Sequence, residues 1–103
     1  MSAPKWGAFV PQGWKQELAG LDAATAWATA MDVARRAEEL GYDHLWVYDH
    51  VETVPRPAPT HVFEAWMTLA AVAHVTSRPM LGQMVTCAAY RNPGLLAKQA
   101  ACL

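Results

Sequence analysis

Three short apolar runs recur along the chain at a nearly constant spacing. They begin at Trp6, His44 and Met80, so their starts lie 38 and 36 residues apart. Each run has the length of a strand, and each intervening stretch is long enough for a helix with its two connections. Parallel strands need such long crossovers, whereas antiparallel strands can be joined by a tight turn. The spacing therefore predicts an α/β fold of repeated β-α units with right-handed crossovers.

The predicted strands span Trp6–Val10, His44–Tyr48 and Met80–Thr86. The second run shows almost no polar alternation, which is typical of a strand in a parallel sheet that is covered by helices. Gly82 interrupts the third run. A glycine there marks a bulge or a close approach of the backbone to a flat ring, or it relieves crowding beside an aromatic side chain.

Apolar residues recur at helical steps in the stretches 21–43 and 63–77, and a third helix is expected over 92–103. Asp22 is a suitable N-cap for the first helix, and Gly41 occupies the position of a left-handed C-cap. Asn92 and Pro93 are favourable residues for the N-cap and the first position of the third helix. The order of elements is thus β-α-β-α-β-α.

Two architectures share this order, the (β/α)8 barrel and the doubly wound sheet. A dinucleotide-binding sheet usually carries G-x-G-x-x-G after its first strand, but here that turn reads PQGWKQELAG. The barrel is therefore favoured. Three units are less than half a barrel, so we expect residues 1–103 to form the N-terminal part of a larger barrel domain or to assemble with copies of themselves. The chain stops inside a helical pattern, which favours the first expectation.

Several classes of function find no support in the sequence. A formal net charge of −1 gives no basic footprint for nucleic acid, and no apolar run is long enough for a membrane span or a signal peptide. We therefore expect a cytoplasmic protein. Neither a P-loop nor a G-x-S-x-G motif is present. The histidines and cysteines lack metal-ligand spacing and predict no metal site; they are His44, His50, His61, His74, Cys87 and Cys102.

Three polar segments follow the three predicted strands: residues 11–13, Asp49-His50 and residues 86–92. In barrels, functional sites gather at the carboxyl ends of the strands, so these segments are expected to converge. Neighbouring residues on an extended segment point to opposite sides, so one of Asp49 and His50 can face the mouth while the other braces it. His50 could then move a proton or stabilise an anion. Alternatively, Asp49 caps the loop and His50 is a solvated loop residue.

Four segments, taken together and in order, resemble the N-terminal part of the luciferase-like monooxygenase superfamily, most closely its branch of coenzyme F-420-dependent oxidoreductases. The segments are WGAFVPQGW, AEELGYDHLWVYDHV, FEAWMTLAAVAHVTSRPMLGQMVT and YRNPGLLAKQAACL. The resemblance implies a (β/α)8 barrel whose cofactor ring lies in the mouth. It also implies hydride transfer between the deazaflavin coenzyme F-420 and a small organic substrate.

By the same resemblance, His50 is the expected catalytic residue, and Asp49, Gln83, Met84 and Thr86 are the expected cofactor-binding residues. A non-prolyl cis peptide bond is expected at Gln83–Met84, although the bulky Met84 departs from the smaller residues common there. The phosphate-binding segments of the family lie beyond Leu103, so only part of a cofactor site is expected. Two other functions stay open: an FMN-dependent monooxygenase, and a non-catalytic relic or self-assembling β-α module.

Overall fold

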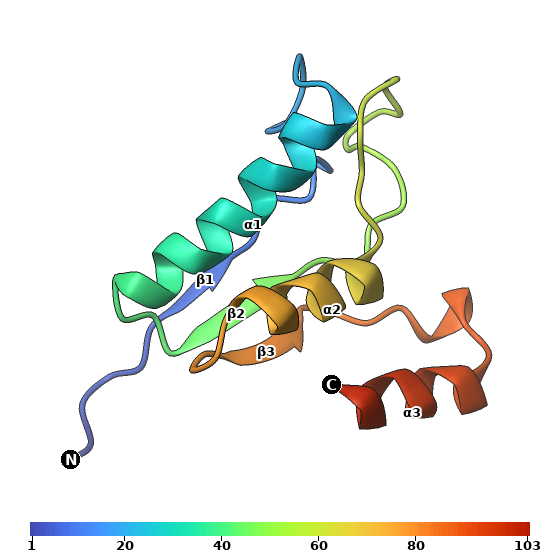
Figure 1. The fold of residues 1–103 in the computed structure, drawn as a ribbon. Helices are drawn as coiled ribbons and strands as arrows, with labels where there is room; N and C mark the ends of the chain where they lie inside the picture. The colour runs from blue at the N-terminus through green and yellow to red at the C-terminus, as the bar shows by residue number, and fades with distance from the viewer.

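The computed structural model describes residues 1–103 and contains a three-stranded parallel sheet with the strand order β1-β2-β3 (Figure 1). The elements are β1 (Gly7–Phe9), α1 (Ala23–Glu39), β2 (His44–Val47), α2 (Ala65–Val75), β3 (Met80–Gln83), a 3-10 turn (Ala88–Tyr90) and α3 (Pro93–Cys102). This is the predicted α/β arrangement, and it is consistent with the N-terminal part of a luciferase-like (β/α)8 barrel. None of the helices combines the length and the apolar character needed to cross a bilayer.

All three strands are shorter than predicted, and β2 ends at Val47, one residue before Tyr48. Pairing of β1 with β2 ends with the hydrogen bond from Val10 N to Trp46 O, because Pro11 has no N–H to donate. At the other edge, β3 ends at Gln83 rather than at Thr86, because its partner β2 ends at Val47 and offers no further backbone groups.

The non-prolyl cis peptide bond lies at Met84–Val85. The sequence-based prediction of Gln83–Met84 was therefore wrong by one residue. The register explains the difference: Gln83 is still paired with Val47 in the sheet, so the irregular backbone begins only after the ladder has ended.

The helix ends follow local capping chemistry. Asp22 Oδ1 accepts a hydrogen bond from Thr25 N at 3.0 Å, and Gly41 has a φ of +87°, so both predicted caps of α1 are confirmed. Helix α2 begins at Ala65, later than predicted, because the side chain of Glu64 accepts from Met67 N at 2.8 Å and acts as its N-cap.

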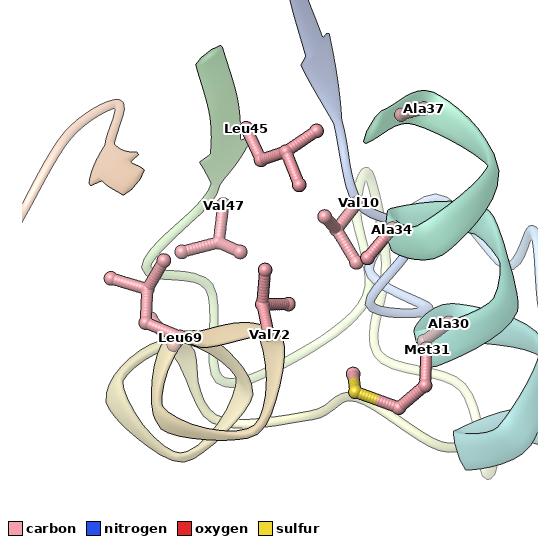
Figure 2. Packing of buried hydrophobic residues seen from close by; sticks show 10 residues of the cluster. Val10, Ala30, Met31, Ala34, Ala37, Leu45, Val47, Leu69 and Val72 are labelled. Atoms are coloured by element: carbon pink, nitrogen blue, oxygen red, sulfur yellow. The ribbon is translucent and has the colours of Figure 1, made fainter. Parts of the chain in front are cut away.

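The hydrophobic core lies between one face of the sheet and helices α1 and α2 (Figure 2). Leu45 and Val47 project from β2 and are almost fully buried, at 1% and 0% exposed. Ala30 and Ala34 bring α1 close to this face because their side chains are small. Helix α3 contributes nothing to the core, since none of its residues is buried.

The opposite face of the sheet has no helix over it (Figure 1). Trp46 occupies its centre, in register with Phe9 on β1 and Gly82 on β3. A Cβ atom on Gly82 would lie 2.4 Å from the Trp46 ring, and one on Gly7 would lie 2.7 Å from it. Of the interpretations open for Gly82, the relief of crowding beside an aromatic ring is therefore confirmed.

Candidate functional site

The loops that follow the three strands meet at one edge of the sheet, as predicted. Gln12, from the loop after β1, is 1% exposed and binds the end of β2 through its side chain. Its Nε2 donates to Tyr48 O at 2.9 Å and to Phe63 O at 3.0 Å, and its Oε1 accepts from Tyr48 N at 2.6 Å. A single buried amide thus joins three segments that are distant in sequence.

A buried carboxylate joins the end of β2 to the loop after β3. Asp49 Oδ2 accepts from Cys87 N at 2.8 Å and from Arg91 at 2.5 Å, and Asp49 Oδ1 accepts a second bond from Arg91 at 2.7 Å. The side chains of Asp49 and Arg91 are only 2% and 9% exposed. Arg91 also pairs with Glu64. This bidentate geometry fixes both the distance and the relative orientation of the two groups.

These contacts determine the charge state of the pair. The hydrogen bonds from Arg91 lower the pKa of Asp49 most, the backbone N–H of Cys87 adds to this, and together they outweigh the effect of burial. The same pair raises the pKa of Arg91. Asp49 is therefore a carboxylate at neutral pH, and its oxygen atoms already accept three hydrogen bonds.

Aromatic rings line the edge beside this network. Phe9 stacks on Tyr48 with ring centroids 4.2 Å apart, and Tyr48 contacts Trp14 at 4.6 Å. Trp14 in turn stacks on His50, with centroids 4.3 Å apart and an angle of 6° between the planes. His50 is half-buried, and one face of its imidazole lies against the Trp14 ring.

The loop after β1 is held in shape by Glu17. Its carboxylate accepts from the backbone N–H groups of Gln12, Gly13 and Lys15 at 2.8 to 3.0 Å. Burial alone would raise the pKa of Glu17, but these bonds together lower it. Gly13 has a φ of +95°, and a Cβ atom there would lie 1.8 Å from His61 O, so only glycine fits where this loop meets the one after β2.

The end of β3 carries three of the predicted cofactor-binding residues. Met84 is 48% exposed and Thr86 is half-buried, and the Thr86 hydroxyl donates to Gln83 Oε1 at 2.8 Å. Gln83 is in register with the buried Val47, on the side of the sheet that α2 covers. The Nε2 atom of Gln83 is buried and has no hydrogen-bond partner.

The structure therefore brings Asp49 into direct contact with the loop after β3, and it places His50 against the loop after β1. It gives Asp49 protein partners on both oxygen atoms, so a ligand could reach that carboxylate only if Arg91 moved. Its expected contact with a cofactor ring stays a prediction, as do the expected roles of His50, Gln83, Met84 and Thr86.

Sequence reasoning missed the roles of Gln12, Trp14, Glu64 and Arg91. One signal was present: an acid directly after a buried strand needs a cationic partner, and the first basic residue after the next strand is Arg91. The position of Trp14 carried no comparable signal, since its contact with His50 depends on the path of two loops.

The histidine and acidic side chains of the chain do not cluster in a way that could bind a metal ion. No group of three or more His, Cys, Asp or Glu side chains is arranged to hold a metal ion, and both cysteines are free. The strand ends thus present aromatic rings, a half-buried imidazole and a hydroxyl at one edge of the sheet.

Comparison with known proteins identifies the family. No curated protein sequence matches the chain. The family model described as luciferase-like monooxygenase matches residues 10–103, which include β2, β3 and the loops that follow all three strands. The chain therefore belongs to the luciferase-like monooxygenase family.

Proposed function

We propose that the chain is part of an oxidoreductase that transfers a hydride between the deazaflavin coenzyme F-420 and a small organic substrate. The observation that supports this most directly is the convergence of the loops after the three strands on one edge, within the region that matches the family. At family level, a flavin or deazaflavin cofactor and a small-molecule substrate follow from that match. The choice of F-420 rests on the sequence resemblance.

The residues at this edge fit a flat aromatic ring. Phe9, Met84 and Val85 are 40%, 48% and 73% exposed and offer apolar surface at the strand ends. A ring system also needs polar partners at its edge. The Thr86 hydroxyl keeps its acceptor lone pairs because its proton is directed to Gln83 Oε1.

When bound, the cofactor would supply the hydride chemistry, and the protein would supply orientation and electrostatics. In this proposal, His50 gives or takes a proton at a ring nitrogen, and the stacked Trp14 keeps that ring oriented. Thr86 accepts from a ring N–H, and Gln83 directs the Thr86 hydroxyl. Met84 packs against the ring. Asp49 holds the wall of the site through Cys87 and Arg91.

A second candidate is an FMN-dependent monooxygenase, since the description of the matching family names a monooxygenase. The apolar surface and polar atoms at the edge suit an isoalloxazine ring as well as a deazaflavin. The two candidates differ in the cofactor that binds tightly, so they are distinguished by measuring the affinity for each cofactor.

The test is a pair of titrations of the chain, one with F-420 and one with FMN, followed by fluorescence polarisation of the cofactor. The proposal predicts saturable binding that is tighter for F-420. Met84→Glu should weaken it by about tenfold or more, equivalent to ~1.4 kcal/mol, because it places a carboxylate where the apolar ring would pack.

Met80→Glu is the matched control, because Met80 is an exposed methionine at the start of β3, whereas Met84 directly follows its end. It should leave the affinity unchanged. Tighter binding of FMN would favour the monooxygenase. Absence of binding to either cofactor would favour the non-catalytic alternative, and equal losses in the two variants would move the site away from the strand ends.

A further inference from the structure

Two polar contacts hold the ends of the long loop between β2 and α2 together. On one side, Gln12 binds Tyr48 at the start of the loop and Phe63 near its end. The backbone adds a fourth bond, from Phe63 N to Gln12 O at 2.8 Å. Residues 48 and 63 are therefore fixed relative to each other by the loop that follows β1.

On the other side, Arg91 holds Asp49 and Glu64, the residues that follow Tyr48 and Phe63. Its guanidinium binds Asp49 through two hydrogen bonds and Glu64 through another. Glu64 is also the N-cap of α2, where its second oxygen accepts from Met67 N. Residues 49 and 64 are thus tied to the loop after β3, and the positive charge lies between two carboxylates.

Asp49 links the contact with Arg91 to the stack of His50 on Trp14. Asp49 and His50 are consecutive on an extended segment, so the first points inward to Arg91 while the second points to Trp14. A rotation of the Asp49 backbone would therefore move the imidazole off the Trp14 ring. We infer that Arg91 is a positioning residue: by fixing Asp49 it keeps His50 stacked on Trp14 and, if the proposed function holds, aimed at the cofactor.

The chemistry of the guanidinium supports a positioning role over a purely stabilising one. A buried ion pair is on average no more stabilising than apolar residues of the same volume, because both charges lose their hydration. What a bidentate pair supplies is a fixed direction. A lysine at position 91 would keep the charge but would not reproduce the two parallel bonds to Asp49.

The test uses the chain without any cofactor. An indole ring shifts the proton signals of an imidazole stacked on it to higher field, so the ring protons of His50 report the stack directly in an NMR spectrum. His50→Gln identifies these signals among those of the four histidines, and Trp14→Leu gives their position when the stack is absent.

Arg91→Met is expected to remove most of this upfield displacement, and Arg91→Lys is expected to remove part of it. Arg78→Met is the control, because Arg78 is exposed and lies before β3, at the other end of the sheet. It should keep the full displacement. Circular dichroism of each variant establishes that the helices persist.

A folded Arg91→Met chain with the full displacement would overturn the inference. If that variant does not fold, Arg91→Lys decides: full displacement overturns the inference, and reduced displacement supports it. This readout is independent of cofactor binding. If wild-type protein shows the displaced signals and Arg91→Met loses them, but F-420 and FMN do not bind, the positioning role stands and the proposed function fails.

Discussion

The two faces of the sheet differ in what holds them. On the face covered by α1 and α2, stability comes from apolar side chains such as Leu45 and Val47, which make no polar contacts and are almost completely buried. On the open face, large side chains such as Phe9 and Met80 stay 40% and 65% exposed. At its carboxyl edge, order comes instead from a buried amide, a buried ion pair and stacked rings.

This difference indicates that the packed face provides stability, whereas the carboxyl edge of the open face orients side chains. The packed face can lose volume only at a cost to stability, because cavities there are not refilled. At the open edge, buried polar contacts fix the orientation of a few side chains, and a reactive site requires such fixed orientations. Substitutions on the packed face should therefore mainly lower stability, whereas substitutions at the open edge should mainly change the orientation of side chains.

The largest effect is expected from Leu45→Ala. Leu45 is 1% exposed and packs between the sheet and both helices, so its truncation should lower the free energy of unfolding by about 2–5 kcal/mol. Urea denaturation followed by circular dichroism measures this. Met80→Ala, on the open face, should cost less than about 1 kcal/mol; equal losses would show that both faces are packed alike.

Gln12→Ala should have the next largest effect. It would leave the partly buried N–H and C=O of Tyr48 and the C=O of Phe63 without their side-chain partner, which costs about 1–3 kcal/mol. Gln16→Ala is a control in the same loop, because the Gln16 side chain is exposed and makes no hydrogen bond in the structure. If the two variants unfolded at the same urea concentration, the role of Gln12 would be contradicted.

The ion pair should show itself in the dependence of stability on pH. The pKa of Asp49 is lower in the folded chain than in the unfolded one, because Arg91 and Cys87 N bind the carboxylate. Its contribution is therefore present above about pH 4, the unfolded value, and is lost as the pH falls through the folded pKa.

Thermal unfolding of Asp49→Asn measures this contribution. The variant should be less stable than wild type at neutral pH, and the difference should shrink as the solution is acidified below about pH 4. Wild type should still lose stability in acid, since the pKa values of Glu17, Asp22 and Glu38 are also lowered. A constant difference at all pH values would contradict the account.

The smallest effect is expected on the solvent side of α1. Asp32 and Arg35 form a salt bridge at 2.7 Å, but their side chains are 73% and 50% exposed. Asp32→Ala should therefore change the free energy of unfolding by less than about 0.5 kcal/mol. A larger loss in the same urea experiment would mean that surface charges contribute to this fold more than its buried contacts suggest.

Much of the fold could be predicted from the sequence, because periodicity and capping are local. The caps at Asp22 and Asn92 and the order of strands and helices follow from neighbouring residues alone. The strand ends were less predictable, since β3 ends where its backbone pairing with β2 ends, at Val47 and Gln83. That limit depends on the register between strands, which no local pattern encodes.

The candidate site could be placed but not assembled from the sequence. The position of Asp49 and His50 after a buried strand located them at the carboxyl edge. The partner of Asp49, however, is 42 residues further along the chain, and its contact depends on the path of the loop after β3. The stack of His50 on Trp14 likewise requires two loops to meet, so it became visible only in three dimensions.

The most direct test of the central claim uses the five tryptophans as markers of position. Each indole N–H gives one signal in a ¹⁵N-correlated NMR spectrum, and Trp14 lies at the proposed site whereas Trp6 and Trp27 lie away from it. When F-420 is added, the account predicts that the Trp14 signal moves most and that the Trp6 and Trp27 signals stay in place. Movement of the Trp6 signal with an unchanged Trp14 signal would contradict a cofactor site at the carboxyl ends of the strands.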